Sequence, residues 1–434
     1  MDAVAYDEVP PNPAALIQAI RSIGYGLGAA VADIVDNSIT AGATRIDLDF
    51  HWDGSQSWIR CIDDGQGMSA EGLKEAMRIG ARLPSETRED SDLGRFGLGL
   101  KTASFSQGKR LSVQTRTLGG ATHTRCWDLD HVTRTNRWEL LTHAPDARAE
   151  MLLDCLPEGG SGTVVLWEHL DRALPDDLSA GSADKFRADI SAVYDHLATC
   201  FHRFLGPRAR LTIRVNGREV EPWDPFHKHD EATLFLPREQ LGDGRDAVFL
   251  QGFVIPRAAL VPPVEGSRYR SLTPRQGIYV YRERRLLVAG GWLGICADDP
   301  DFALARLRVD ITNAVDREWK VDISKSKVTP PSASSTWLRG YVARLQRDAR
   351  TVLRRREAVS RGIAQTEADP VWIATSSAGS LTIRINRAWS MLEAPGLASV
   401  PRDELEALLI AIETALPVSL LANPTLRADA RRKS

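Results

Sequence analysis

Residues 63–68 read Asp63-Asp64-Gly65-Gln66-Gly67-Met68 and directly follow the strand-like run Trp58-Ile59-Arg60-Cys61-Ile62. Two glycines allow a backbone to approach a ligand closely, and a carboxylate at a strand end can accept a hydrogen bond from an exocyclic amine. The alternative interpretation is an ordinary Asp-Gly turn, which is common in proteins. An EF-hand is excluded, because the later positions of such a loop lack acidic ligands here.

A polar helix face is expected upstream, at Asp33-Ile34-Val35-Asp36-Asn37. Residues 14–40 have a helical pattern interrupted by glycines, so we predict two helices there. Asp33 and Asn37 are four positions apart and therefore share one face of the second helix. A carboxylate one turn from a carboxamide can activate a water beside a metal-bound phosphate, whereas a solvated polar stripe is the alternative interpretation.

A glycine-rich run follows downstream and reads Gly94-Arg95-Phe96-Gly97-Leu98-Gly99-Leu100-Lys101-Thr102-Ala103-Ser104. Gly97 and Gly99 precede a helix-like segment, so their backbone N–H groups can form a nest for phosphate. The run is neither a Walker A motif nor a dinucleotide fingerprint, because the spacing that each requires is absent. A glycine-rich loop alone does not specify a function.

The three stretches stand in this order and are followed by Gly162-Thr163 at the start of a later strand. Together they resemble the GHKL ATPases, which include DNA gyrase B, heat-shock-ninety-type chaperones, histidine kinases and MutL, and in particular the bacterial MORC-like proteins. Asp-Asn-Ser, Asp-Asp-Gly-Gln-Gly-Met and Phe-Gly-Leu-Gly-Leu-Lys carry the resemblance, which covers about residues 14–170. It implies an α+β protein whose first domain, residues 1–170, is a Bergerat-fold α/β sandwich that binds ATP and Mg²⁺.

The resemblance also implies roles for single residues. Asn37 would hold the Mg²⁺ that bridges the phosphates, Asp63 would accept from the adenine amino group, and Thr163 would help to read adenine through water. Beside the base would lie the rest of the acidic box, at Gly65, Gly67 and Met68. The phosphates would be wrapped by the glycine-rich run, at Gly94, Gly97, Leu98, Gly99, Leu100 and Lys101.

The general base departs from the family pattern. Members usually have Glu four residues before the Asn, and this chain has Asp33 there. The shorter side chain withdraws the carboxylate, and a misplacement of ~1 Å can lower a rate ~100-fold. The sequence therefore predicts slow hydrolysis by Asp33, or a role shared with Asp36, and nucleotide binding that does not depend on Asp33. Residues 80–91 would form the lid that closes over ATP.

A second α+β region is predicted at about residues 171–330. Its expected elements are a helix at 182–205, strands at 211–215, 247–255 and 278–281, and a hairpin turn at Asn216-Gly217. The region resembles the transducer domain of MutL, gyrase B and MORC proteins, in which a lysine reaches the γ-phosphate. Lys325 and Lys327 are the candidates for that catalytic contact; the sequence does not choose between them, and two surface lysines are the alternative.

A helical C-terminal region is predicted at residues 331–434, after a linker at 330–335, with helices near 337–353 and 403–416. Eight arginines and two acids lie between Arg339 and Arg361. Such a run could contact nucleic-acid phosphates, but charge runs are more often solvated helix faces.

The composition excludes several classes of protein. The 55 Lys and Arg and 57 Asp and Glu of the 434-residue chain give a net charge of −2, so it is not a generally basic nucleic-acid coat. The 5 cysteines lie far apart, which argues against zinc ribbons and disulfide scaffolds. His227 and His229 lack further metal ligands nearby, so a surface loop is the preferred interpretation. Without a signal peptide or membrane-spanning run, we expect a cytoplasmic protein that does not contact membranes.

These features predict an ATP-driven conformational switch. ATP and Mg²⁺ would close the lid, two subunits would form a nucleotide-dependent homodimer, and slow hydrolysis would reset this clamp on DNA or on a partner protein. By resemblance, the clamp could serve DNA repair, chromosome handling or defence against phage. The alternatives are a nucleotide sensor that does not hydrolyse ATP and a chaperone of the heat-shock-ninety class.

Overall fold

The computed structural model describes residues 7, 9–22, 24–80, 99–174, 181–260, 275–321, 328–364, 372–377, 380–387, 392 and 400–415. The chain divides into two compact units, Met1–Arg350 and Thr351–Ser434. The predicted α+β class is confirmed, because the first unit alone combines helices with two separate sheets.

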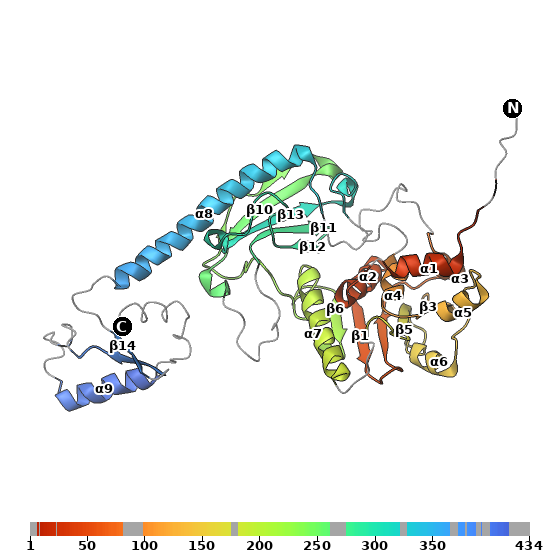
Figure 1. Cartoon of the computed structure of the whole chain (residues 1–434), viewed down its shortest axis with the longest axis horizontal. Helices are drawn as coiled ribbons and strands as arrows, with labels where there is room; N and C mark the ends of the chain where they lie inside the picture. The colour runs from red at the N-terminus through yellow and green to blue at the C-terminus, as the bar shows by residue number, and fades with distance from the viewer. Residues whose placement is uncertain are drawn as a thin grey trace. The chain divides into compact units, whose positions relative to one another are not determined.

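A seven-stranded sheet organises the N-terminal part of the first unit (Figure 1). Its strands are β1 (Arg45–His51), β2 (Trp58–Asp63), β3 (Arg110–Arg116), β4 (Thr122–Asp128), β5 (Gly162–Glu168), β6 (Thr212–Val215) and β7 (Arg218–Glu219). They lie in the order β4-β3-β5-β2-β1-β6-β7. Neighbours are antiparallel except for β1 and β6, which are parallel.

Helices accompany this sheet on both faces. In the described residues they are α1 (Pro13–Arg21), α2 (Leu27–Thr40), α3 (Ala70–Met77), α4 (Gly99–Phe105), α5 (Leu129–Thr135), α6 (Ala147–Leu153) and α7 (Ser182–Cys200). The two helices predicted within residues 14–40 are confirmed as α1 and α2. Asn12 caps α1 by accepting a hydrogen bond from the Ala15 amide, and Pro13 occupies the first turn, where a missing N–H is tolerated.

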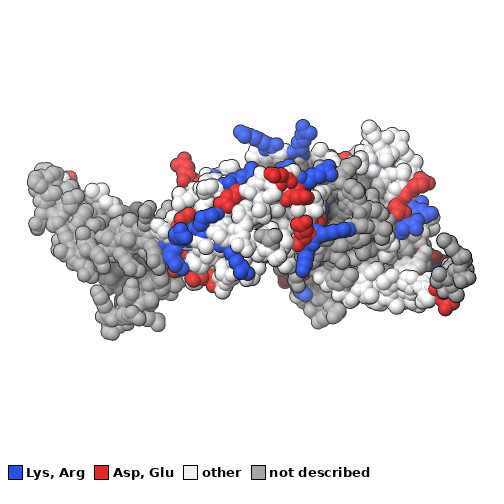
Figure 2. Space-filling view, turned by 90° about the horizontal axis from the view of Figure 1, so that it is seen from above, with Lys and Arg blue, Asp and Glu red and all other residues white. Residues whose placement is uncertain are grey.

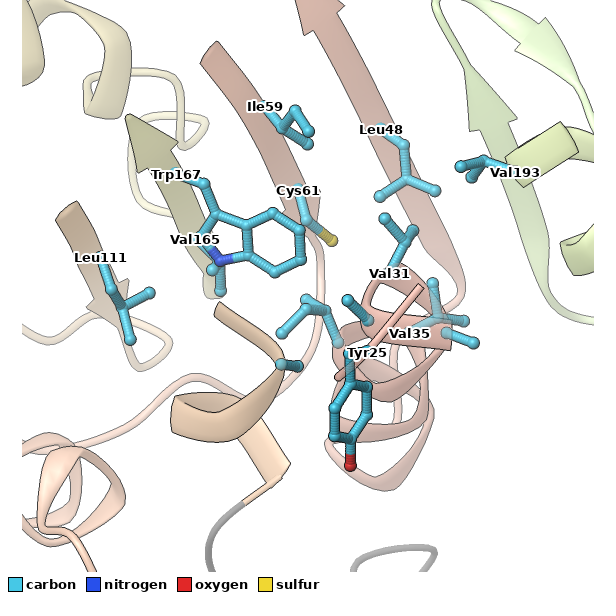
Figure 3. Packing of buried hydrophobic residues seen from close by; sticks show 14 of the residues in the cluster. Tyr25, Val31, Val35, Leu48, Ile59, Cys61, Leu111, Val165, Trp167 and Val193 are labelled. Atoms are coloured by element: carbon cyan, nitrogen blue, oxygen red, sulfur yellow. The ribbon is translucent and has the colours of Figure 1, made fainter. Parts of the chain in front are cut away.

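The main core lies between the sheet and α2. The alternation predicted for β1 is confirmed, since Ile46, Leu48 and Phe50 are buried. Figure 3 shows the strand side chains directed toward α2, which are Leu48, Ile59, Cys61, Val165 and Trp167. The opposite face of β5 packs Val164 and Leu166 against α6. Because β5 is covered on both faces, its position is fixed, and so are the ends of β2 and β3 that pair with it.

The first sheet extends beyond residue 170. Arg45 to Leu48 of β1 pair in parallel with β6, and the turn at Asn216-Gly217 returns the chain into β7, as the sequence predicts. Helix α7 contributes Phe186, Val193 and Leu197 to the core of the same sheet. These elements were predicted in the second region, whereas strand pairing joins β6 to the first sheet and packing joins α7 to its core.

A second sheet follows, in the order β12-β11-β13-β10-β8, with β9 also paired to β10. Its strands are β8 (Leu234–Phe235), β9 (Glu239–Leu241), β10 (Val248–Val254), β11 (Gly277–Arg282), β12 (Arg285–Ala289) and β13 (Ala305–Ile311), and short 3-10 helices lie at η1 (Gly244–Asp246), η2 (Arg257–Leu260), η3 (Pro300–Phe302) and η4 (Asn313–Val315). The predicted strands at 247–255 and 278–281 are confirmed as β10 and β11.

Helix α8 (Ser332–Ala364) packs on the second sheet through Tyr341 and Leu345, which would contact a Cβ at Gly252 at 3.0 and 3.2 Å. The helix begins at Ser332, so the last four residues of the predicted linker at 330–335 form its first turn. Neither α8 nor any other helix in the described ranges combines the length and apolar character that crossing a bilayer requires.

The second unit also contains strands, which the prediction of a helical C-terminal region did not include. It contains a two-stranded antiparallel sheet, β14 (Trp372–Ser377) and β15 (Ser380–Ile385), beside the expected helix α9 (Arg402–Ala415). The run Leu381-Thr382-Ile383-Arg384-Ile385 alternates apolar and polar residues, which is the period of a strand. The amide of Ile385 donates to the Glu413 carboxylate at 2.7 Å, so β15 is tied to α9.

Candidate nucleotide site

Asp63 stands at the end of β2, with 6% of its surface exposed. One carboxylate oxygen accepts from the Gly65 amide at 2.9 Å, and the other accepts from Ser38 Oγ at 2.8 Å. Burial raises the pKa of Asp63, and the hydrogen bonds from Ser38 and Gly65 act in the opposite direction. The carboxylate is therefore held in a fixed orientation by both the strand end and α2.

Glycines let the backbone close tightly around this carboxylate. A Cβ on Gly67, where φ is +68°, would lie 2.0 Å from the Arg116 carbonyl oxygen. A Cβ on Gly162 would lie 2.1 Å from the Asp63 carbonyl oxygen. Only glycine fits at either position, because the backbone of the acidic box lies against neighbouring strand backbone.

Thr163 reaches the same end of the sheet because it is the register partner of Asp63 across β2 and β5. Its hydroxyl lies 3.0 Å from Thr115 Oγ1, which donates to the Gly162 carbonyl at 3.0 Å and accepts from the Met68 amide at 3.0 Å. The structure thus brings Asp63, Met68 and Thr163 together in one hydrogen-bonded group.

The polar face of α2 adjoins this group. Asp33 is 3% exposed and Asp36 is fully buried, whereas Asn37 is exposed. A Cβ on Gly99, the first residue of α4, would lie 3.8 Å from Asp33 Oδ2. The candidate base therefore lies beside the start of the helix that follows the glycine-rich run, and the carboxamide of Asn37 is open to a ligand.

Lys101 has a contact that sequence reasoning did not anticipate. It is 3% exposed, and its ammonium group donates to the Ala76 carbonyl in the last turn of α3 at 2.7 Å. Leu100, beside it on α4, is half-buried.

Several predicted site residues lie outside the described residues. They are Gly94, Gly97 and Leu98 of the glycine-rich run, residues 81–91 of the expected lid, and both candidate lysines, Lys325 and Lys327.

Sequence reasoning missed Ser38 and Thr115 as site residues. Ser38 directly follows Asn37, and this adjacency in the Asp-Asn-Ser run was the available signal. Thr115 carried no signal of its own, because its position opposite Thr163 arises only when β3 pairs with β5. In the described part of the chain no group of three or more His, Cys, Asp or Glu side chains could hold a metal, and this includes the surroundings of His227 and His229.

A known family covers this part of the chain. The family model described as "Histidine kinase-, DNA gyrase B-, and HSP90-like ATPase" matches residues 25–163, a range that includes α2, the acidic box and Thr163. Residues 25–163 form a GHKL-type ATPase domain. Such a domain binds ATP, and its family membership indicates ATP hydrolysis.

Curated relatives of the GHKL-type domain include members of two groups. The DNA mismatch repair protein MutL of Shewanella woodyi is 23% identical over 237 residues, which are 54% of this chain and 32% of that protein. The ATPase morc-1 of Caenorhabditis elegans is 31% identical over 87 residues, or 20% of this chain and 10% of that protein. Human ATPase MORC2 is 33% identical over 90 residues, which are 20% of this chain and 9% of that protein. The chain thus spans about a third or less of these relatives' lengths.

Proposed function

We propose that the protein is a slow, Mg²⁺-dependent ATPase that dimerises when it binds ATP and closes as a clamp on DNA or on a partner protein. The observation that carries this proposal is the position of Asp63, whose two oxygens are oriented by Ser38 and Gly65 beside Thr163. A fixed carboxylate acceptor at a strand end suits an exocyclic amine such as that of adenine. The relatives support DNA as a ligand, because MutL is a DNA mismatch repair protein, and ATP turnover, because the MORC proteins are ATPases. Closure as a clamp is what the family resemblance implies.

Asn37 fits the magnesium that the family implies. Its carboxamide is exposed and lies one helical turn from Asp33. Mg²⁺ in nucleotide sites takes few protein ligands and completes its shell with phosphate and water oxygens. Asn37 offers one such oxygen ligand on α2, and the described residues contain no dedicated cluster of acids. This arrangement agrees with the way in which Mg²⁺ is usually bound in nucleotide sites. When bound, the ion would neutralise negative charge on the phosphates.

Asp33 would serve as the general base. A Cβ on Gly99 would lie 3.8 Å from its Oδ2, so the carboxylate stands next to the phosphate-binding run. The shorter reach of Asp compared with Glu makes slow turnover the expected result.

A nucleotide sensor is the second candidate function. It is favoured by one observation, the 3% exposure of the short Asp33 side chain, which limits its access to a water. In that case the chain would bind ATP and act through its partners with almost no hydrolysis.

We do not propose that the clamp binds DNA through the arginines of α8. Arg344 pairs with Glu239, and Arg350 pairs with Asp301 at 3.1 Å, so these arginines are partly neutralised. Figure 2 shows Lys and Arg interspersed with Asp and Glu over the face that it views. A mixed face of this kind is a poor match for a phosphate backbone.

The test is Mg²⁺-ATP hydrolysis by the purified chain, with and without double-stranded DNA. Asp33→Asn should abolish turnover and keep ATP binding, whereas Asp63→Asn should abolish both. Asp47→Asn, on β1 and on the opposite face of the sheet from Asp63, is the matched control and should behave as the parent. Turnover that persists in Asp63→Asn would overturn the assignment of the site. ATP binding without turnover in the parent would select the sensor, and stimulation by DNA would support the clamp.

A further inference from the structure

A buried ion pair joins α2, the helix of the candidate nucleotide site, to the second sheet. Arg285 on β12 donates through Nε to the Asp36 carboxylate on α2, at 3.0 Å from Oδ2 and 3.2 Å from Oδ1. The two side chains are 5% and 0% exposed, and 249 positions separate them in the chain. Arg285 also donates through Nη1 to the Leu286 carbonyl at 3.0 Å, and its guanidinium lies over the Phe201 ring, 5.8 Å from the centroid.

The place of Asp36 on α2 gives this contact its importance. At 3.6 residues per turn, Asp33 lies about 40° around the helix from Asn37 and about 60° from Asp36 on its other side. The candidate base is thus flanked by the candidate magnesium ligand and by the residue that Arg285 holds. A shift of Asp36 rotates or displaces both neighbours, because all three share one rigid helical turn.

Electrostatics agree with this geometry. Burial alone would lower the pKa of Arg285, but Asp36, Cys200 and Asp33 together raise it. The guanidinium is therefore within electrostatic reach of the candidate base as well as of Asp36. Removing one partner of a buried ion pair leaves an uncompensated charge, so the pair fixes a position more than it adds stability.

Helix α7 supports the pair from the side. His196 packs on α2, where a Cβ on Gly28 would lie 3.2 Å from the His196 Cβ. His196 Nε2 lies 3.4 Å from Cys200 Sγ, one turn further along α7. Burial alone would raise the pKa of the Cys200 thiol, but His196 and Arg285 bring it below its usual value. These groups enclose the ion pair in a buried polar cluster that neither α2 nor β12 could form alone.

We propose that Arg285 is a positioning residue through which the second sheet holds α2, and with it Asp33 and Asn37, in the geometry that ATP hydrolysis needs. The proposal rests on the proposed ATPase function of the same site. It makes hydrolysis depend on where the second sheet stands relative to α2. It also means that a movement of α2 on nucleotide binding would be transmitted to the second sheet through Arg285.

The experiment compares Arg285→Met, Arg285→Lys and Asp36→Asn with the parent chain. We expect Arg285→Met to lower kcat about 10- to 100-fold, as displacement of a reacting group does, while the Kd for ATP measured without Mg²⁺, to which Asn37 does not contribute, changes less than about twofold. Arg285→Lys keeps the charge and should recover much of kcat. The double variant Arg285→Met/Asp36→Asn should lose no more than the worse single variant, because both remove one contact.

Arg282→Met is the matched control. Arg282 is the β11 register partner of Arg285, is 3% exposed, and forms a comparable ion pair of 2.8 Å with Asp316, which follows β13. This substitution removes a buried ion pair from the second sheet without touching Asp36, so kcat should stay within about twofold of the parent. Equal losses in Arg282→Met and Arg285→Met, or a loss of ATP binding with kcat, would overturn the positioning role.

A second readout separates this proposal from the ATPase proposal. Hydrogen exchange is followed in α2 and β12 when a non-hydrolysable ATP analogue is added. The parent should show altered exchange in both elements, and Arg285→Met only in α2. A response of β12 that persists in Arg285→Met would reject the coupling even if the parent hydrolyses ATP. If the parent shows no turnover, the ATPase proposal fails, and the exchange response still decides whether Arg285 couples the two elements.

Discussion

Ser38 on α2 donates a 2.8 Å hydrogen bond to Asp63 at the end of β2. This bond joins the helix that carries the candidate base to the strand that carries the candidate adenine acceptor. It also favours the charged form of Asp63, against a burial that raises its pKa. Ser38 therefore acts on both the position and the charge of the acceptor.

Removing the hydroxyl should weaken ATP binding without removing the site. In Ser38→Ala the Asp63 carboxylate loses a charge-assisted hydrogen bond, and its pKa rises further. We expect the Kd for ATP to increase about tenfold at pH 7, the equivalent of about 1.4 kcal/mol. The deficit should grow as the pH falls, because a protonated carboxyl is a poorer acceptor. Titration of ATP by calorimetry at pH 7 and pH 5.5 measures both effects.

Ser57 provides the control for this substitution. It is a buried serine at the opposite end of β2, where its hydroxyl donates to the Gly54 carbonyl at 2.8 Å. Ser57→Ala should bind ATP as the parent does. Equal affinities of Ser38→Ala and the parent at both pH values would show that the hydroxyl does not support the acceptor.

Gly67 cannot accept a side chain. In Gly67→Ala the new Cβ would overlap the Arg116 carbonyl oxygen, 2.0 Å away, at a φ of +68°. We expect ATP binding to be lost and the free energy of unfolding to fall by about 2–4 kcal/mol, from backbone strain together with overpacking. Urea unfolding and ATP titration measure the two effects.

Gly54→Ala isolates the contribution of backbone strain. Its φ is +52° and nothing lies within 4 Å of the new Cβ, so only the left-handed conformation should disfavour alanine, by about 1–2 kcal/mol. If Gly67→Ala were no more destabilised than Gly54→Ala and bound ATP normally, the tight packing of the acidic box against β3 would be irrelevant to the site.

Local patterns explain why much of this site was predictable. The alternation in β1 and the glycines of the acidic box constrain their own segments, so they are visible in the sequence before any folding is considered. The order of the motifs then carried the family resemblance, and the family match over residues 25–163 confirms that resemblance.

Contacts between distant segments were not predictable in this way. Ser38 meets Asp63 across 25 positions and Asp36 meets Arg285 across 249, and neither pair leaves a periodic signal. The parallel pairing of β1 with β6 likewise moves α7 and β6 from the expected second region onto the first sheet. Such contacts arise only when distant segments of the chain pair in the folded protein.

Tyr341 anchors α8 to a gap in the edge of the second sheet. Strand β9 pairs with β10 up to Leu250 and β8 pairs from Phe253, so the Gly252 amide donates instead to Tyr341 Oη at 2.8 Å. The same hydroxyl donates to the Pro237 carbonyl at 2.6 Å. The tyrosine thus satisfies a buried amide and a nearby carbonyl that the strands leave unpaired.

In Tyr341→Phe both backbone groups should lose their partner at nearly unchanged volume. We expect the free energy of unfolding to fall by about 1–3 kcal/mol and the Gly252 amide to exchange its hydrogen faster. The Leu236 amide, which donates to the Gly252 carbonyl at 2.9 Å, is the internal control and should keep its protection. Unchanged exchange at Gly252 would contradict the anchoring role.

His202 should make stability depend on pH. Its Nε2 lies 2.8 Å from Tyr281 Oη, and burial lowers the pKa of His202 from 6.5 to about 3, although Asp224 opposes the shift. Between these two pKa values the unfolded chain binds a proton that the folded chain excludes. Stability from this group is therefore complete above about pH 6.5 and is lost progressively as the pH falls toward 3, by about 2 kcal/mol at pH 5.

The substitution His202→Gln tests this, because an amide can keep a hydrogen bond to Tyr281 and does not titrate. We expect its free energy of unfolding to fall less than that of the parent between pH 7 and pH 5, by about 2 kcal/mol. Urea unfolding followed by tryptophan fluorescence measures this difference. Between pH 7 and pH 8 the two proteins should differ by a constant amount, since His202 is neutral in both states there. Parallel curves down to pH 5 would mean that His202 accepts its proton as readily in the folded protein as in the unfolded chain.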